Sequence, residues 1–158
     1  MNIPTGGTRE MTKLLIVYHS RSGNTEEMAK AVYDGALSAG ATVIMKKVKD
    51  ATGNDLLDCD TVIFGTPTNF GYMSGIMKEF FDQAWLGIGD KVANKRYCAF
   101  TSAGSGAKQA LESIDRICNS FNERKQFKFI KCREGIVATL KPSPEVLEQC
   151  RGLGREMA

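Results

Sequence analysis

The chain has 158 residues, a length that fits one domain. Apolar residues make up 42% of the sequence and charged residues 25%, an ordinary globular composition that excludes a disordered or fibrous chain. The formal net charge of +3 is too small to indicate nucleic-acid binding. No apolar run approaches the roughly 18–20 residues of a membrane span, and the N-terminal residues hold no signal-peptide core. We therefore expect a cytoplasmic protein without a membrane span.

The first half of the chain alternates predicted strands and helices. Lys13–Tyr18 reads KLLIVY, a nearly continuous apolar run that is typical of a parallel strand covered on both faces. Residues 24–39 carry apolar side chains at helical spacing, and a glycine ends that predicted helix. β-Branched and apolar residues predict strands at 41–48, where a lysine pair lies near the end, and at 61–65. The polar segment 50–60 between them predicts at most a short helical turn.

The second half continues this alternation. Ser74 can cap a helix that carries phenylalanine and methionine side chains on one face. Residues 96–101 predict a strand, and residues 107–121 carry the clearest helical apolar stripe in the chain. Residues 127–138 predict a fifth strand, in which Gly135 suggests a bulge or bend.

A last helix opens at Ser143, which can cap it, with Pro144 as its first residue. Five strands that alternate with helices predict an α/β fold: a parallel sheet with helices on both faces. We expect one domain at 13–158, and a disordered leader or a tag remnant at 1–12. Ligands of such sheets bind outside the carboxyl ends of the strands, so the loops after strands one, three and four decide the function.

The first of these loops combines hydroxyl groups and a glycine at a helix N-terminus. Unpaired backbone N–H groups and the positive end of the helix dipole there suit a phosphate group. The lysine of an ATP-binding loop is missing, since Asn24 stands in its place, and there is no GxGxxG pattern. A plain Ser/Gly turn that caps the helix is the alternative. The residues of this loop are Ser20, Arg21, Ser22, Gly23, Asn24 and Thr25.

The other two loops can hold a flat heteroaromatic ring. Such a ring needs an apolar wall and a few hydrogen bonds at its edge. The loop after strand three has glycines, a proline, an amide, hydroxyl groups and two aromatic side chains, whereas the loop after strand four is small and flexible. Each loop alone could be an ordinary turn, but three such loops on one edge favour a ligand site. Their residues are Gly65, Thr66, Pro67, Thr68, Asn69, Phe70, Gly71 and Tyr72 in one, and Thr101, Ser102, Ala103, Gly104, Ser105 and Gly106 in the other.

With these motifs the sequence resembles the flavodoxin-like FMN-binding family from Lys13 to the C-terminus. SRSGNT resembles the family's phosphate loop. GTPTNFGYMSGIMKEFFDQ and FTSAGS resemble the corresponding stretches of its WrbA-type NAD(P)H:quinone oxidoreductase and NADPH-dependent FMN reductase branch. The resemblance implies a five-stranded sheet of order 2-1-3-4-5 with FMN at its edge. It places the FMN phosphate on Ser20–Thr25, the ring against Pro67–Gly71, and the far edge of the ring near Ser102–Gly106.

The function that follows is FMN-dependent redox chemistry, in which the flavin carries hydride or electrons and no catalytic side chain is needed. We expect NAD(P)H-dependent reduction of quinones, flavins or similar acceptors. The alternatives are a non-enzymatic electron carrier between protein partners and an interaction domain that has lost FMN. The sequence does not decide the oligomeric state, and a homo-oligomer is one alternative. No Asp or Glu lies in 65–76 or 100–111, which favours the negative charge that a reduced flavin gains.

Several further residues have two interpretations. His19, the one histidine, is either a proton donor or a structural, partly buried residue. Phe70 and Tyr72 either flank the ring or have a lid or partner-contact role, and Trp85 is expected in the core or an interface rather than on the flavin. The basic residues of 124–133 form either a solvated face or a docking patch for NADPH or an acidic partner.

The five cysteines predict buried, reduced thiols, because zinc ribbons, iron–sulfur clusters and CxxC redox sites all need close pairs. Cys118 and Arg124 have the Cys-x5-Arg spacing of phosphatases. Cys118 lies on the apolar face of a predicted helix, however, and not on a phosphate-binding loop. We therefore predict no metal site and no cysteine nucleophile. The cysteines are Cys59, Cys98, Cys118, Cys132 and Cys150.

Overall fold

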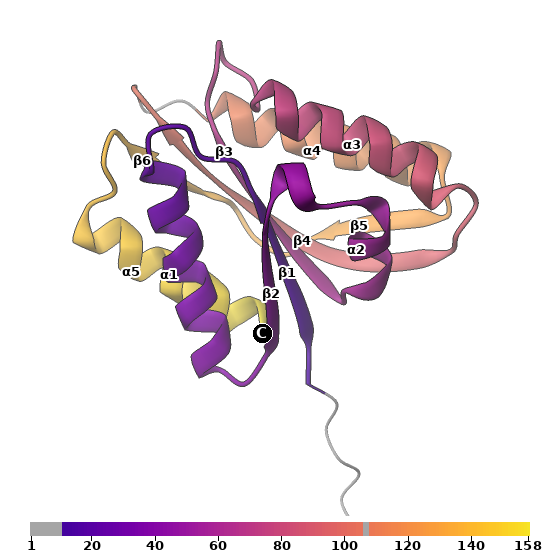
Figure 1. The fold of residues 1–158 in the computed structure, drawn as a ribbon, viewed down its shortest axis with the longest axis horizontal. Helices are drawn as coiled ribbons and strands as arrows, with labels where there is room; N and C mark the ends of the chain where they lie inside the picture. The colour runs from indigo at the N-terminus through magenta and orange to yellow at the C-terminus, as the bar shows by residue number, and fades with distance from the viewer. Residues whose placement is uncertain (1–10, 106–107) are drawn as a thin grey trace, which may run out of the picture.

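The computed structural model describes residues 11–105 and 108–158. Residues 1–10, where most of the leader was predicted, lie outside the described part of the chain, and so does Gly106. The described residues form an α/β fold in which helices cover both faces of a parallel sheet (Figure 1).

The sheet has the predicted order β2-β1-β3-β4-β5, and every pair of neighbouring strands is parallel. A further strand, β6, pairs with β4. β1 and β3 are buried on both faces, in agreement with their apolar runs. The strands are β1 (Lys13–Tyr18), β2 (Thr42–Lys47), β3 (Thr61–Pro67), β4 (Ala93–Ala103), β5 (Phe127–Lys131) and β6 (Ile136–Thr139).

The predicted fifth strand, 127–138, is two short strands that follow each other along one edge of β4. Residues 93–97 of β4 pair with β5, and residues 100–103 pair with β6, so β4 is longer than predicted. Gly135 lies between the two strands. A Cβ atom there would stand 2.6 Å from the backbone oxygen of Ala99 and 2.8 Å from a methyl group of Leu111. The absent side chain lets the chain pass close to β4 where it changes from one strand to the next.

The helices form two layers (Figure 1). α1 and α5 cover one face of the sheet, while α2, α3 and α4 cover the other. Serine side chains cap α3 and α5 as predicted: Ser74 accepts from the N–H of Met77, and Ser143 accepts from the N–H of Val146. The bounds are α1 (Asn24–Ser38), η1 (Val48–Asp50), α2 (Gly53–Asp58), α3 (Gly75–Ile88), α4 (Gln109–Arg124) and α5 (Pro144–Met157).

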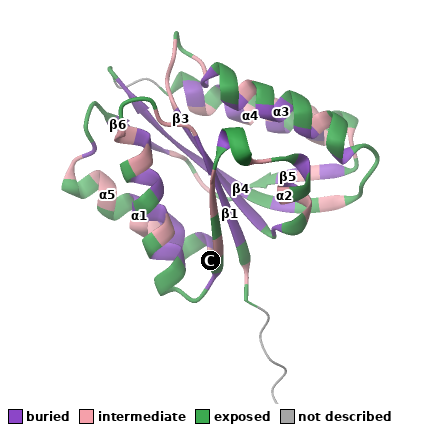
Figure 2. Cartoon of the chain, viewed as in Figure 1, coloured by how far each residue is buried: buried purple, intermediate pink, exposed green. Residues whose placement is uncertain are grey.

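The core has two parts, one on each face of the sheet (Figure 2). Phenylalanine side chains dominate the part under α3 and α4, where Phe64 packs on Phe81 with ring centroids 4.9 Å apart. Trp85 joins this part by an edge-to-face contact with Phe121 at 4.9 Å, and the ammonium group of Lys125 lies 4.5 Å from its ring centroid. The expectation that Trp85 is a packing residue is confirmed.

The other part of the core depends on close contact between α1 and α5. A Cβ atom on Gly154 would lie 2.1 Å from the backbone oxygen of Val32, and one on Gly35 would lie 1.9 Å from that of Arg151. Both distances are far shorter than any van der Waals contact, so glycine alone permits this approach. The two glycines therefore set how tightly α1 and α5 pack.

The cysteines are all free, and four of them are buried. Burial raises the pKa of Cys59 and Cys98 to about 11 and that of Cys150 to about 12. Cys118 is fully buried in α4, so the argument against a phosphatase site holds. Cys132 is exposed, and the prediction of burial was wrong there, because this residue lies in the irregular segment between β5 and β6.

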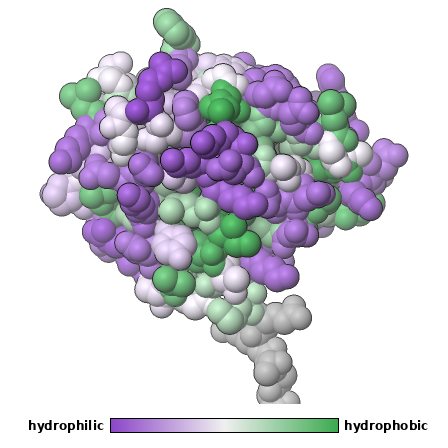
Figure 3. Space-filling model, in the orientation of Figure 1, coloured by the Kyte–Doolittle hydropathy of each residue, from purple (hydrophilic) through white to green (hydrophobic). Residues whose placement is uncertain are grey.

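The surface seen in Figure 3 is mostly hydrophilic, with small separate hydrophobic areas. Large apolar side chains that are exposed come from several different elements, among them Leu37, Ile44, Leu86 and Val92. Scattered exposed apolar residues are normal for globular proteins. No helix in the described part of the chain is long and apolar enough to cross a membrane.

Candidate functional site

The three loops singled out by the sequence meet at the carboxyl edge of the sheet. The hydroxyl groups of Thr25 and Ser102 are hydrogen-bonded at 2.7 Å, which joins the β1–α1 loop to the end of β4. The hydroxyl groups of Thr68 and Thr101 lie 2.9 Å apart, and the N–H of Thr68 donates to the carbonyl of Ser102 at 2.8 Å. The β3–α3 loop is therefore tied to the same strand end.

The β1–α1 loop folds around one serine hydroxyl. The Oγ of Ser20 accepts from the N–H groups of Gly23 and Glu26, each at 3.1 Å. Gly23 has φ 97°, a left-handed conformation that favours glycine, and it directly precedes α1. Within the described residues, several further backbone N–H groups of this loop and of the first turn of α1 have no protein acceptor, among them those of Arg21, Ser22, Asn24 and Thr25.

These four N–H groups and the helix dipole create a positive potential, which can bind an anion without any charged side chain. Ser22 is exposed and Thr25 is buried, so the loop has an open side and an anchored side. Arg21, also exposed, adds a guanidinium group. This geometry suits an anion such as a phosphate group, and the phosphate site stays a prediction.

The β3–α3 loop holds an aromatic side chain in solvent. Asn69 and Tyr72 exchange two backbone hydrogen bonds, of 2.9 and 3.0 Å, around Phe70 and Gly71. Both central residues have positive φ, 51° and 69°, as a type I′ turn requires. Such a φ is unfavourable for a bulky residue, and the side chain of Phe70 is fully exposed. Backbone strain at an exposed aromatic residue makes Phe70 a candidate for a functional role, because the side chain contributes no packing.

The β4–α4 loop starts buried and ends open. Ser102 and Ala103 are buried, while Gly104 and Ser105 are exposed. A fourth segment, which the sequence analysis missed, reaches the same edge: the N–H of Leu140 donates to the carbonyl of Ala103 at 2.8 Å. Leu140 has φ 59° and an exposed side chain. Only the register of β6 beside β4 brings it there, and no local pattern predicts that register.

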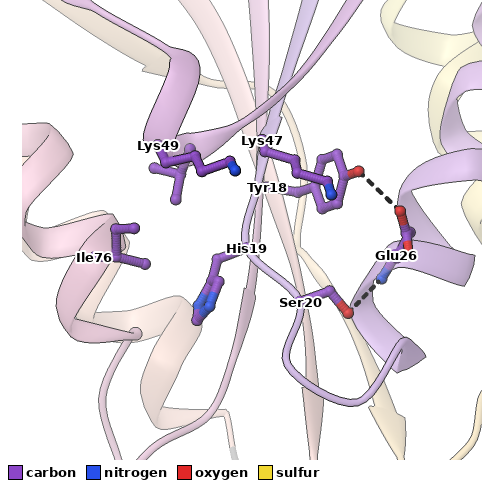
Figure 4. Close-up of a pocket in the computed structure, with 8 residues that line it drawn as sticks. Tyr18, His19, Ser20, Glu26, Lys47, Lys49 and Ile76 are labelled. Carbon is purple, nitrogen blue, oxygen red and sulfur yellow. Dashed lines mark hydrogen bonds between the residues drawn. The ribbon is translucent and has the colours of Figure 1, made fainter.

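A pocket of about 240 Å³ opens at the carboxyl ends of β1 and β2 (Figure 4). Of the predicted site residues, it contains only Ser20. The hydroxyl group of Tyr18 donates to Glu26 at 3.1 Å on one side, and burial together with this carboxylate raises the pKa of Tyr18. The lining residues are Tyr18, His19, Ser20, Glu26, Lys47, Val48, Lys49 and Ile76.

His19 has a partly buried ring in this pocket, as the structural interpretation expected. Its backbone N–H donates to Gly65 at 2.9 Å, and its buried Nδ1 has no hydrogen-bond partner in the described structure. Burial lowers the pKa of His19, and the nearby guanidinium group of Arg21 lowers it further. The neutral imidazole is thus the favoured form.

The basic segment 124–133 is largely engaged within the molecule. Lys131 pairs with Asp115 at 2.7 Å, and Arg133 pairs with Glu156 at 3.1 Å. Lys128 donates to the carbonyl of Asn122. These contacts favour the solvated face over the docking patch.

The comparisons with known proteins point to one family. The family model "Flavodoxin" matches residues 16–149. A flavodoxin of Aquifex aeolicus is 36% identical over 159 residues, which cover 94% of this chain and 86% of that protein. NAD(P)H dehydrogenase (quinone) 3 of Rhizobium meliloti is 40% identical over 116 residues, which cover 60% of this chain and 55% of that protein.

Solved structures share the fold. An archaeal flavodoxin superposes with a TM-score of 0.79 at 24% identity, over 92% of this chain and 96% of that one. A WrbA-like protein from Agrobacterium tumefaciens superposes with a TM-score of 0.73 at 25% identity, over 92% and 94%. The fold, the phosphate-loop geometry and the matched length agree, and the chain belongs to the flavodoxin family of FMN-binding redox proteins.

Proposed function

We propose that this protein is an FMN-dependent oxidoreductase that uses NAD(P)H to reduce quinones, flavins or similar small acceptors. The observation that carries the FMN site is the set of N–H groups without a protein acceptor in the β1–α1 loop. In this proposal residues 13–158 form the FMN-binding domain, and the reduced cysteines fit a cytoplasmic protein.

The phosphate of FMN would lie on Ser20–Thr25. The N–H groups of Arg21, Ser22, Asn24 and Thr25 have no protein acceptor among the described residues, so they are left to donate to the phosphate oxygens. Because the hydrogen bond to Ser102 holds Thr25 in place, the phosphate site does not need to be assembled on binding.

The ring would lie between Pro67–Gly71 and Ser102–Ser105. Phe70 offers an aromatic face that is already exposed, so no buried contact has to break when a ring stacks on it. Asn69 supplies an amide for the polar edge of the ring, and Gly104 lets the ring approach the backbone. When bound, FMN supplies hydride and electron transfer chemistry that no side chain provides.

The charges around these loops favour a flavin that accepts hydride from NAD(P)H. Hydride transfer brings negative charge to the site, and carboxylates close to it would oppose that charge. Residues 65–76 and 100–111 contain no Asp or Glu, and Arg21 adds a positive charge beside the phosphate loop. The Rhizobium meliloti relative, by its name an NAD(P)H dehydrogenase of quinones, supports the same activity.

The second candidate is a non-enzymatic carrier of electrons between protein partners. The relative from Aquifex aeolicus, named as a flavodoxin, aligns with nearly the whole chain and favours this alternative.

The test is the purified protein reconstituted with FMN, mixed with NADH or NADPH and a soluble benzoquinone, and followed at the nicotinamide absorbance band. Steady oxidation over many turnovers supports the reductase. Slow oxidation at the rate of free FMN, together with reduction by a partner reductase, supports the carrier. Protein that binds no FMN, and so stays colourless, overturns both.

A further inference from the structure

We propose that the pocket at the ends of β1 and β2 binds the 2′-phosphate of NADPH. The proposal rests on the proposed NAD(P)H-dependent function. It adds that particular residues make the protein prefer NADPH to NADH.

Two lysines bring unpaired positive charge to this pocket. Lys47 ends β2 and Lys49 follows in η1, and both side chains extend over the pocket in Figure 4. Neither has an ion-pair partner among the described residues, whereas the neighbouring Lys46 is bound by Asp55 at 2.8 Å. The only carboxylate in the lining is that of Glu26, which accepts from the hydroxyl group of Tyr18.

Hydrogen-bonding groups complete the floor of the pocket. The backbone of Ser20 begins the phosphate loop, and the His19 ring lies beside it between Ile76 and Ser20 (Figure 4). The Nδ1 atom of His19 is buried without a partner in the described chain, so the imidazole has hydrogen-bonding capacity that the protein does not use and that a ligand can use.

The positive charge of the two lysines and the apolar walls of the pocket favour a phosphate monoester that is attached to an organic group such as a ribose. A monoester carries nearly two negative charges at neutral pH, which two ammonium groups balance, whereas each phosphate of a dinucleotide bridge carries one. Val48 and Ile76 add apolar walls against which a ribose can pack, and about 240 Å³ holds more than a phosphate ion.

The position relative to the proposed ring site suits a dinucleotide. The ring would lie over the ends of β3 and β4, and the pocket lies at the ends of β1 and β2. Neighbouring strands are roughly 4.8 Å apart, so the two places are separated by roughly 10 Å along the sheet edge. NADPH, with two nucleosides joined through two phosphates, can span this distance with its nicotinamide on the ring.

The experiment measures binding to the FMN-loaded protein by calorimetry. The probe is 2′,5′-ADP, and 5′-AMP is the matched ligand without the 2′-phosphate. We expect 2′,5′-ADP to bind at least tenfold more tightly. Lys47→Gln and Lys49→Gln should each weaken its binding about fivefold, the size of an exposed charge contact. Lys91→Gln, an equal loss of charge in the α3–β4 loop, should have no effect.

Equal affinity for the two probes, or no effect of both lysine substitutions, overturns the proposal. Binding of 2′,5′-ADP only to FMN-free protein also overturns it, because the pocket would then belong to the FMN phosphate. Equal oxidation of NADH and NADPH overturns the 2′-phosphate site and leaves the reductase intact. Lysine-dependent binding of 2′,5′-ADP without any NADPH oxidation supports the site and overturns the reductase.

Discussion

The hydroxyl groups of Thr25 and Ser102 lie 2.7 Å apart, although 77 positions separate them in the sequence. Thr25 is the second residue of α1 and Ser102 is near the end of β4. Both are buried, so their hydroxyl groups depend on each other rather than on water. This hydrogen bond joins the two loops that would hold the two ends of FMN.

We expect Thr25→Val to lower the free energy of unfolding by about 1–2 kcal/mol, because it leaves the buried hydroxyl group of Ser102 without its partner. FMN affinity should fall as well. Thr25→Ser keeps a hydroxyl group and is the matched control. Urea unfolding and FMN titration measure both effects. Equal stability of the Val and Ser variants would contradict the importance of this contact.

Ser22→Asp should weaken FMN binding strongly, because a carboxylate would face the phosphate across the open side of the loop. The Asn side chain has nearly the same size as Asp but no charge, so the Ser22→Asn variant should bind FMN more tightly than the Ser22→Asp variant. Since Ser22 is exposed, neither substitution should change stability by more than about 0.5 kcal/mol. Fluorescence titration with FMN decides; equal affinity of wild type and Ser22→Asp would show that the phosphate binds elsewhere.

Phe70→Asn should separate stability from ligand binding. Asn accepts the left-handed conformation at φ 51° better than Phe, so the variant should be more stable by about 1 kcal/mol. It loses the aromatic face, and FMN affinity should fall. Thermal unfolding of the FMN-free protein and FMN titration test the two parts. An unchanged affinity would assign Phe70 to partner contact instead of ring binding.

Gly154→Ala should be strongly destabilising, by about 2–3 kcal/mol, since the new Cβ would meet the backbone of α1 and force the helices apart. Gly152→Ala, two residues earlier in α5, is the control: its Cβ would meet only the Arg155 side chain at 3.8 Å. That control should gain up to about 1 kcal/mol from helix propensity. Urea unfolding measures both, and similar changes in the two variants would contradict the close packing.

His19 should titrate below the ordinary histidine pKa of about 6.5. Its pKa is lowered in the folded protein, so the unfolded chain binds more protons in this range. The His19 contribution to stability is therefore complete above about pH 6.5 and is lost as the pH falls through the folded pKa. Because the sequence has one histidine, NMR of its ring protons reports this pKa directly. Unfolding at pH 7.5 and 5.5 should show a smaller pH effect in His19→Asn than in wild type.

Local patterns were enough to predict most of the elements. The apolar run of Lys13–Tyr18 and the caps at Ser74 and Ser143 depend on residues close in sequence, and the structure confirms them. The alternation of strands and helices predicted the parallel sheet, whose carboxyl edge collects the loops after β1, β3 and β4. The resemblance of SRSGNT and its companion motifs to the flavodoxin-like family supplied the strand order, which the structure has.

Tertiary structure alone decided the contacts between segments. The division of the last strand depends on how Gly135 passes β4, and the exposure of Cys132 follows from that division. The strained turn at Phe70 needs both hydrogen bonds between Asn69 and Tyr72.

The position of the pocket lysines is another feature that the sequence alone did not show. The lysine pair near the end of β2, Lys46 and Lys47, was visible in the sequence, but not that Lys47 would line a pocket with Lys49 while Lys46 pairs with Asp55. Periodicity and capping are encoded within a few neighbouring residues, so a sequence displays them. Contacts between the ends of different strands depend on strand order and register, which arise only when distant segments pack together.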